Sequence, residues 1–290
     1  MKRLTARRVF PPALTGVLLL LSFSGSAAAA DRVSVENYAG RSLIVYLPSR
    51  LPIQGTRALV VVLHGGMGNA ERIESRQSEN GLNMDAVAEK NGFIVAYLNG
   101  TPDTRYLGAD KLGWNAGGGC CGLSAENNVD DVSYITGAVD YLAGKYGIDR
   151  KRVYGMGHSN GAMMTQRLMC ETRLYAAAVA ISGPLNLEIA NCSAARGKSI
   201  LAIHGADDEN VPIAGGQGTK GISKAVYTSE EHTRLIFSNS GASYDLQVVK
   251  GADHKLDDID IALEKTEGKR RREGRQVFWL GDAKSLTQNY

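Results

Sequence analysis

Short, continuous runs of apolar residues recur along this chain, and segments with a helical pattern lie between them. The runs span residues 58–63, 93–98, 153–156, 176–181, 200–203 and 246–249. Strands that are buried on both faces of a parallel sheet have this appearance, because helices cover both sides of such a sheet. The clearest helical pattern lies at residues 128–146, where Val132, Ile135 and Val139 recur on one face. This order predicts an α/β fold with a mostly parallel central sheet and helices on both faces.

Other segments complete the predicted organisation. Two alternating segments, residues 32–37 and 42–47, predict an antiparallel hairpin at the start. No linker, repeat or low-complexity tract divides residues 31–290, so we expect one domain. The connection over residues 99–127 is rich in Gly and too long for a simple turn, and we expect it to form the wall of a pocket.

Basic residues gather at the start of the chain. Of the 290 residues, 33 are Lys or Arg and 30 are Asp or Glu, which gives a formal net charge of +3. Residues 1–30 contain four basic residues and no acidic one, then an apolar stretch and four alanines ending at Ala30. Such a segment is typical of a cleaved signal peptide, so we expect a secreted or periplasmic protein. The Arg7-Arg8 pair leaves the general secretory and the twin-arginine routes open.

The remaining sequence is nearly neutral. Without residues 1–30, 29 basic residues face 30 acidic ones, a net charge of −1. This balance gives no reason to expect a nucleic-acid partner. The basic run at residues 269–275 has no interleaved aromatic residues, and we interpret it as a surface loop. No second apolar run of membrane length follows, so we expect no membrane contact after cleavage.

Four cysteines, Cys120, Cys121, Cys170 and Cys192, lie outside the predicted signal peptide. An even number of cysteines in an exported protein favours disulfides. Because a bond between adjacent cysteines is strained, we expect Cys120 and Cys121 each to pair with one of the two later cysteines. One bridge with two free thiols stays an alternative. No C-x-x-C motif or histidine cluster accompanies them, so we expect no metal.

Residues 157–161 read Gly-His-Ser-Asn-Gly and match the pattern G-x-S-x-G. They follow a predicted buried strand and precede a helical segment at about residues 161–170. This is the position at which a sharp strand-to-helix turn lifts a serine hydroxyl above the sheet. The crowded turn requires small residues on both sides of the serine. Ser159 is therefore the predicted nucleophile, with the positive end of the following helix directed at it.

A serine hydroxyl needs a base and an acid that orients the base, and in this arrangement the order along the chain is Ser, acid, His. Only His232 and His254 lie far enough downstream. His232 falls in a polar helical stretch, whereas His254 follows a predicted strand in a Gly-Ala-Asp-His loop, so we predict His254 as the base. The acid should follow the preceding strand, where Asp208 fits H-G-x-x-D-x-x-V-P and Asp207 is the alternative.

His204 opens this motif, and we expect it to stabilise the loop rather than to take part in catalysis. An oxyanion needs two backbone N–H groups. We predict one from Asn160, after the nucleophile, and one from Gly66 in the His-Gly-Gly-Met-Gly segment, with Met67 as the alternative donor. We also expect a substrate pocket lined by His64, Met67, Trp114 and His158.

Two remaining patterns are discounted. Residues 216–221 match G-x-G-x-x-G, but they do not lie between a strand and a helix, so we expect no dinucleotide there. Asp257, Asp258 and Asp260 read as the start of a helix that ends near Leu263, rather than as calcium ligands. The sequence predicts no cofactor.

Taken in order, the motifs at residues 64–66, 114–117, 120–122, 129–132, 159–161 and 204–212 resemble the secreted polyhydroxybutyrate depolymerase and feruloyl esterase family of α/β-hydrolases. The resemblance spans about residues 58–258. It implies an α/β-hydrolase catalytic domain that hydrolyses carboxylic esters, with Ser159 as nucleophile, Asp208 as acid and His254 as base. Many members carry Trp-Pro-Gly after the histidine, where this chain has Lys255-Leu256-Asp257.

We therefore expect a secreted serine esterase that acts through an acyl-enzyme on small or polymer-linked esters. A Ser/Thr-rich linker with a polymer-binding domain is not present in the sequence, and only 7% of the residues are aromatic. Soluble esters, such as feruloyl or short-acyl compounds, are the expected substrates. The alternatives are a serine peptidase on the same fold and a hydrolase-fold protein that binds without catalysis. The sequence names neither the natural ester nor the oligomeric state.

Overall fold

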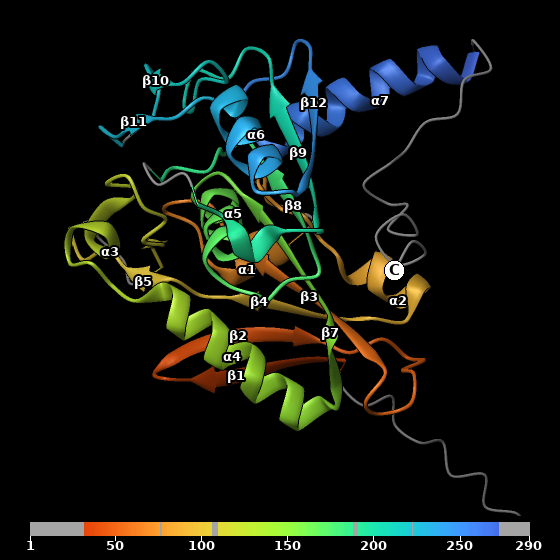
Figure 1. The fold of residues 1–290 in the computed structure, drawn as a ribbon. Coiled ribbons are helices and arrows are strands. Elements are labelled where there is room, and N and C mark those ends of the chain that lie inside the picture. Colours follow the sequence, from red (N-terminus) through yellow and green to blue (C-terminus); the bar gives the residue numbers. More distant parts are fainter. Residues whose placement is uncertain (1–31, 76, 106–109, 188–190, 222, 273–290) are drawn as a thin grey trace, which may run out of the picture. The chain divides into compact units, whose positions relative to one another are not determined.

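A sheet of eight strands, in the order β1-β2-β4-β3-β7-β8-β9-β12, runs through the part of the chain that the computed structural model describes (Figure 1). The described residues are 32–75, 77–105, 110–187, 191–221 and 223–272. They all belong to one compact unit, Asp31–Tyr290. The predicted signal peptide lies outside the described residues.

The first strands form the expected hairpin, and the rest of the sheet is parallel. β1 (Val33–Tyr38) pairs antiparallel with β2 (Arg41–Tyr46), and β2 pairs antiparallel with β4 (Ile94–Leu98). All later pairs in this sheet are parallel. The remaining strands are β3 (Arg57–Leu63), β7 (Ile148–His158), β8 (Ala177–Ile181), β9 (Ser199–Gly205) and β12 (Ser243–Val249). The prediction of a mostly parallel sheet is confirmed.

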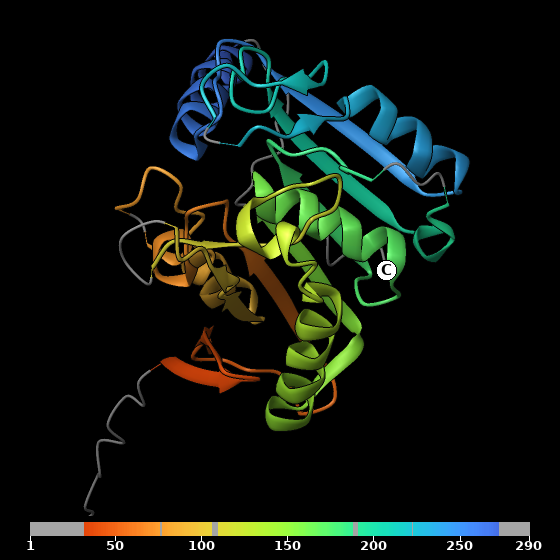
Figure 2. The same ribbon diagram turned by 90° about the vertical axis from the view of Figure 1, so that its left-hand side faces the viewer.

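Helices cover both faces of the sheet. Alternate residues of a strand therefore enter two separate apolar cores, one on each face. Leu59 and Val61 of β3 pack in the core that also holds residues of α4, α5 and α6, while Ala58 and Val62 pack in the core that holds residues of α1, α2 and α7. Figure 2 shows the side with α4 facing the viewer. The helices are α1 (Ala70–Glu74), α2 (Asp85–Asn91), α3 (Gly122–Glu126), α4 (Asp131–Tyr146), α5 (Asn160–Glu171), α6 (Glu230–Asn239) and α7 (Leu256–Arg272), with a 3-10 turn at Ser193–Ala195.

Helix α7 is longer than expected. It continues to Arg272 rather than ending near Leu263, so the basic run begins within a helix and not in a loop. Leu256, Ile259 and Ala262 bury one face of its first turns, and the residues that follow are mostly good helix formers. Within the described residues, no helix combines the length and the apolar composition needed to cross a membrane.

Two short ribbons lie in the connections. In the long connection over residues 99–127, β5 (Thr101–Pro102) pairs with β6 (Leu112–Gly113), and this connection also contains α3. Later, β10 (Gly216–Gln217) pairs with β11 (Val226–Tyr227). The Gly-rich segment at residues 216–221 therefore begins in strand β10, and no helix begins within it.

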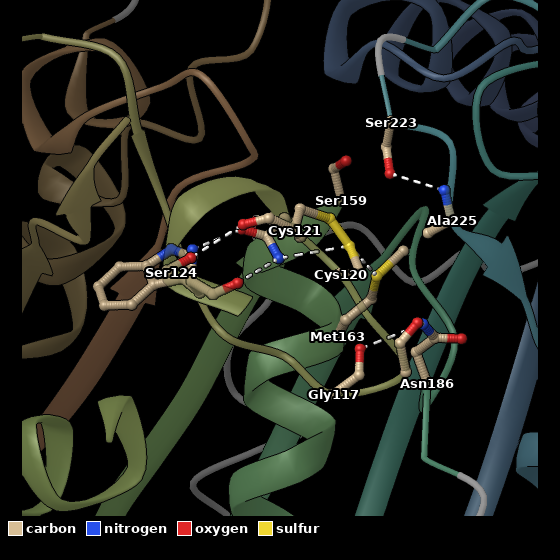
Figure 3. The surroundings of a disulfide bond; sticks show 12 residues. Gly117, Cys120, Cys121, Ser124, Ser159, Met163, Asn186, Ser223 and Ala225 are labelled. Atoms are coloured by element: carbon tan, nitrogen blue, oxygen red, sulfur yellow. Dashed lines mark hydrogen bonds between the residues drawn. A yellow bond between two sulfur atoms is a disulfide. The ribbon is translucent and has the colours of Figure 1, made fainter. Parts of the chain in front are cut away.

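The disulfides differ from the expected pairing. Cys120 is bonded to Cys121, and Cys170 is bonded to Cys192. The reason is the length of α5. The Cys120 sulfur contacts Met163 near the start of this helix, as Figure 3 shows, whereas Cys170 lies in its last turn. Seven helical residues, about 10 Å of helix, separate these two positions. Cys192 lies beside the far end of α5, next to the 3-10 turn, and so meets Cys170.

Candidate active site

Ser159 occupies the sharp turn between β7 and α5. Its backbone has φ 54° and ψ −123°, a conformation that residues with a side chain rarely adopt. The turn is crowded, since a Cβ on Gly157 would collide with the backbone of Gly161, and a Cβ on Gly161 would collide with the carbonyl oxygens of Leu63 and His64. The two glycines are therefore what allows the sequence to turn here. The Ser159 N–H donates to the Ile181 carbonyl, which ties the turn to β8.

The structure brings Ser159, His254 and Asp208 into one hydrogen-bonded series. His254 Nε2 lies 2.8 Å from Ser159 Oγ, and His254 Nδ1 lies 2.7 Å from Asp208 Oδ2. Asp208 follows β9 and His254 follows β12, and because these strands are parallel their carboxyl ends meet at one edge of the sheet. The arrangement can remove the serine proton to Nε2 while the carboxylate accepts a hydrogen bond from Nδ1.

The alternatives that the sequence left open lie elsewhere. Asp207 is exposed, and its N–H donates to the Ala252 carbonyl. Asp208 is buried and directed at the imidazole. His232 is exposed on α6 and does not reach the serine. The geometry therefore favours Asp208 and His254, as the sequence predicts.

The Asp208 carboxylate is held in its ionised form. Burial alone would raise its pKa, but hydrogen bonds from His204 and His254 and the charge of His254 hold the pKa well below its usual range. Its second oxygen accepts the N–H groups of Asn210 and Val211 at 2.9 and 2.8 Å. A carboxylate with this many donors is fixed in position as well as in charge.

His204 stabilises the loop after β9, as expected, and has a partner that the sequence did not indicate. Its Nε2 lies 2.9 Å from the Val211 carbonyl, and its Nδ1 lies 2.8 Å from the Glu230 carboxylate. Burial would lower the pKa of His204, but hydrogen bonds to Asp208 and Glu230 raise it to about 9. Glu230 begins α6, where an acidic residue is ordinary, so nothing in its sequence context singles it out.

Gly66 and Asn160 lie next to each other at the expected place for an oxyanion. A Cβ built on Gly66 would lie 3.7 Å from the Asn160 Cβ. The Asn160 N–H belongs to the first turn of α5, where helix N–H groups have no partner within the helix. Among the described residues the Gly66 N–H donates to no acceptor, whereas the Met67 N–H donates to the Leu112 carbonyl at 2.8 Å. The structure therefore favours Gly66 over Met67 as a donor.

The side chain of Asn160 fixes the wall of the site. Its Oδ1 accepts the Trp114 N–H at 2.8 Å, and its Nδ2 donates to the Trp114 carbonyl at 3.0 Å. The same Nδ2 lies 3.6 Å from the Cys120 sulfur. One amide thus links the predicted oxyanion residue to the long connection that carries Trp114 and Cys120.

Trp114 does not line the pocket, contrary to the expectation. Its side chain is fully buried, and its indole Nε1–H donates to the His64 carbonyl at 2.9 Å. His64 accepts the Gly100 N–H on Nε2 at 3.0 Å, so its Nδ1–H donates to the Gly65 carbonyl at 2.8 Å. Burial lowers the pKa of His64 to about 4, although the bond to Gly65 opposes this. These two side chains support the loop that carries Gly66.

A cleft of about 690 Å³ opens at Ser159. Three of the expected pocket residues, His64, Met67 and His158, line it. The connection over residues 99–127 forms much of its wall, as predicted, with polar, charged and apolar groups that include Thr101, Asp103, Arg105, Leu112, Cys121, Leu123 and Ser124. The opposite side contains Asn210, Val211, Ser223, Lys224, Ala225 and Tyr227. Figure 3 shows Cys121 and Ser223 on either side of Ser159.

Among the described residues, no group of three or more His, Cys, Asp or Glu side chains is arranged to hold a metal ion. The histidines near the cleft bond to protein groups instead: His64 to the backbone, and His158 through Nε2 to the His254 carbonyl at 2.8 Å.

Comparisons with known proteins find esterases among the relatives of this chain. Over 180 residues the chain is 31% identical to feruloyl esterase B of Piromyces equi, and the aligned region covers 61% of this chain and 31% of that protein. It is 30% identical over 155 residues to acetylxylan esterase A of Emericella nidulans, covering 51% and 44%. The chain spans less than two thirds of the length of these relatives.

Solved structures show the same fold. The Bacillus cereus carboxylesterase matches with a TM-score of 0.53 at 17% identity, covering 79% of this chain and 95% of that one. An acetyl xylan esterase from Aspergillus awamori matches with a TM-score of 0.52 at 16% identity, covering 77% and 94%. The predicted α/β-hydrolase fold is confirmed.

The expected resemblance to feruloyl esterases is likewise confirmed by sequence. A family model described as phospholipase/carboxylesterase matches residues 52–258, which include every predicted catalytic residue. The chain belongs to the phospholipase/carboxylesterase family.

Proposed function

We propose that this protein is a serine esterase that hydrolyses carboxylic esters through an acyl-enzyme. The single observation that carries the proposal is the hydrogen-bonded series from Ser159 Oγ to His254 Nε2 and from His254 Nδ1 to Asp208, at 2.8 and 2.7 Å. Ser159 and His254 line a cleft, and the chain belongs to the phospholipase/carboxylesterase family, which supports the same conclusion.

In the first half-reaction, Ser159 Oγ forms a bond to the ester carbonyl carbon while its proton moves to His254 Nε2. The carbonyl oxygen becomes negative and accepts hydrogen bonds from the N–H groups of Gly66 and Asn160. The bond to the alkoxy oxygen then breaks, and the proton on His254 goes to the leaving alcohol. Asp208 stays ionised throughout and stabilises the imidazolium that forms.

Water completes the reaction. It adds to the acyl carbon and gives a proton to His254 Nε2, and the second tetrahedral intermediate uses the same two N–H groups. Collapse of this intermediate breaks the acyl–Oγ bond, and the proton returns from His254 to Ser159. The free acid leaves and the enzyme is regenerated, without a cofactor.

The cleft supports small, polar esters as substrates. Around Ser159 it combines apolar groups, such as Met67 and Leu123, with charged groups, such as Asp103, Arg105 and Lys224. Feruloyl and acetyl esters of carbohydrates offer both kinds of surface, and relatives are named feruloyl and acetylxylan esterases. We propose esters of this class, rather than an insoluble polyester, as substrates.

We further propose that residues 1–30 act as an export signal and that residues 31–290 form one catalytic domain. The basic start, the apolar stretch and the alanines before residue 31 support the first point. The match of the family to residues 52–258, with all catalytic residues inside it, supports the second.

The test is a panel of p-nitrophenyl acetate, p-nitrophenyl butyrate, methyl ferulate, acetylated xylan, a polyhydroxybutyrate suspension and peptide anilides, assayed with the wild type and Ser159→Ala. We expect turnover of the soluble esters, which Ser159→Ala abolishes. Turnover of anilides but not esters would replace the proposal by a peptidase. Binding of esters without any Ser159-dependent release of acid would instead indicate a protein that binds without catalysis.

A further inference from the structure

A second imidazole and a second carboxylate extend the buried series beyond Asp208. His204 Nε2 lies 3.2 Å from Asp208 Oδ2, the same oxygen that faces His254. His204 Nδ1 lies 2.8 Å from Glu230 Oε1, and the Tyr244 hydroxyl donates to Glu230 Oε2 at 2.6 Å. The side chain of His204 is fully buried and that of Glu230 is 2% exposed, so bulk solvent does not screen these contacts.

The hydrogen bonds define the protonation of His204. The Val211 carbonyl can only accept, so the nitrogen 2.9 Å from it, Nε2, carries a hydrogen. On the other side, Nδ1 lies 2.8 Å from Glu230 Oε1, and the hydrogen bonds that His204 makes to Asp208 and Glu230 outweigh burial and raise its pKa to about 9, so the proton in this contact belongs to the ring at neutral pH. Nδ1 therefore also carries a hydrogen, and the ring is an imidazolium between two carboxylates.

We propose that Glu230 holds His204 as a buried imidazolium, and that this cation positions the Asp208 carboxylate and limits the negative potential that Asp208 exerts on His254. The proposal rests on the proposed catalytic series. His204 and Glu230 do not line the cleft, so they are positioning residues that act through Asp208.

The physical reason lies in the geometry at Asp208 Oδ2. An isolated buried carboxylate next to an imidazole favours the protonated imidazole, and a protonated His254 cannot accept the Ser159 proton. A cation 3.2 Å from the same oxygen offsets part of that field. Glu230 lies beyond His204, farther from His254, so its charge affects His254 mainly by keeping His204 protonated.

The other titratable groups around this series keep one charge state near neutral pH. Burial, and secondarily the charge of His254, lowers the pKa of His158 to about 3, and this ring lies 5.1 Å from that of His254. Burial raises the pKa of Tyr227, and the charge of Asp208 adds to this effect, while burial together with Glu230 raises the pKa of Tyr244. Burial would raise the pKa of Asp253, which accepts the His254 N–H, but its hydrogen bond from Lys220 lowers that pKa and keeps the carboxylate ionised. A change in pH profile on removing Glu230 is therefore transmitted through His204.

The first experiment compares Glu230→Gln with Glu231→Gln in kcat/KM against pH, from pH 5 to 10, on p-nitrophenyl acetate. Glu231 is the next residue but is exposed and pairs with Arg234, so its variant is the matched control. In Glu230→Gln we expect the acidic limb to move to higher pH by about one pH unit, and kcat at neutral pH to fall about tenfold with little change in KM. Glu231→Gln should superimpose on the wild type.

The second experiment does not need activity, so it separates this proposal from the proposed esterase function. Ring ¹H–¹⁵N spectra are recorded on Ser159→Ala, with His204→Gln in the same background to assign the signals. We expect two ring N–H groups on His204 at pH 7.5, and only one after adding Glu230→Gln. Tyr244→Phe keeps the Glu230 carboxylate but removes its hydrogen bond from the tyrosine. We expect it to move the acidic limb of the kcat/KM profile in the same direction by a smaller amount, and it replaces Glu230→Gln in the test if that variant does not fold.

A single ring proton on His204 at pH 7.5 would overturn the proposal, whatever the activity. The proposal would also be overturned if the Glu230→Gln variant folds and has a lower melting temperature but keeps the acidic limb of the wild type. That result would mean that Glu230 has a purely structural role. If no ester is turned over while His204 still carries two protons that depend on Glu230, the positioning network stands and the esterase function fails.

Discussion

His158 Nε2 donates a hydrogen bond of 2.8 Å to the backbone carbonyl of His254. The residue before the candidate nucleophile thus holds the loop that carries the candidate base, 96 positions later in the chain. The strand-to-helix turn therefore sets the position of both groups at once.

Replacing His158 should slow the chemical step. In His158→Phe the His254 carbonyl loses its donor and the loop can move, so we expect kcat to fall about tenfold to hundredfold with KM nearly unchanged. His158→Gln, which can donate to the same carbonyl, should recover part of the loss. Because burial lowers the pKa of His158 to about 3, it is neutral throughout the assay range, and the pH profile should keep its shape. His232→Gln, on the exposed face of α6, is the control. A His158→Phe profile with a shifted acidic limb would contradict this interpretation.

The strained backbone conformation of Ser159 should lower the free energy of unfolding of the protein. A residue with a side chain at φ 54° is strained by about 1–3 kcal/mol, and glycine relieves this strain at a loss of about 0.5–1 kcal/mol in chain entropy. We expect Ser159→Gly to raise the free energy of unfolding by about 1 kcal/mol in urea titrations, while Ser159→Ala, which keeps its Cβ, does not. Both variants should be inactive. Equal stability of the two would show that the turn stores no strain.

Asn160 should matter for stability as well as for rate. Asn160→Ala leaves the buried N–H of Trp114 without a partner and removes one of the two hydrogen bonds to the Trp114 carbonyl, which still accepts the Cys121 N–H, so the free energy of unfolding should fall by about 2 kcal/mol. Urea unfolding monitored by tryptophan fluorescence measures the change. Asn239→Ala, at an exposed position of α6, should have almost no effect. If both substitutions cost the same, the double hydrogen bond to Trp114 contributes nothing specific.

The buried imidazolium should make stability fall at alkaline pH. The pKa of His204 is about 9 in the folded protein and near 6.5 when the ring is in water, so the folded state binds this proton more tightly. The stabilisation is fully present below pH 6.5 and is lost as the pH rises through 9. We expect the free energy of unfolding to decline by up to about 3 kcal/mol across that window. In His204→Gln this part of the slope should vanish, and parallel curves for the two proteins would exclude His204 as its source.

The two disulfides should differ in their effect on stability. The Cys170–Cys192 bond closes a loop of 22 residues, so the double variant Cys170→Ala with Cys192→Ala should lose about 3 kcal/mol and keep its activity if it folds. The Cys120–Cys121 bond joins neighbours, and its removal should cost less through chain entropy. Because Cys121 lines the cleft, we expect that removal to change KM instead. A larger loss of stability for the adjacent pair would contradict this prediction.

Much of the fold follows from local pattern. The six apolar runs became strands of the central sheet, because burial on both faces leaves a signature within each segment. The turn at Ser159 was also predictable, since the required glycines lie within two residues of it. The end of α7 was predicted too early, because apolar residues mark only the part of a helix that packs on the core.

Other features depend on segments that meet only in three dimensions. Trp114 is an aromatic residue in a Gly-rich connection, and local pattern does not show that its indole is turned inward to the His64 carbonyl. The disulfide pairing was predicted wrongly because the length of α5 decides which cysteines meet.

By itself the sequence determined the order of strands and helices and the residue types at the carboxyl edge of the sheet, because these depend on local periodicity and on spacing within each motif. The tertiary structure decided how they combine. It brought Asp208 rather than Asp207 to His254, turned Trp114 away from the cleft, and placed Glu230 next to His204. These outcomes depend on the directions of side chains from elements far apart in the chain, and tertiary packing and hydrogen bonds between those elements fix these directions.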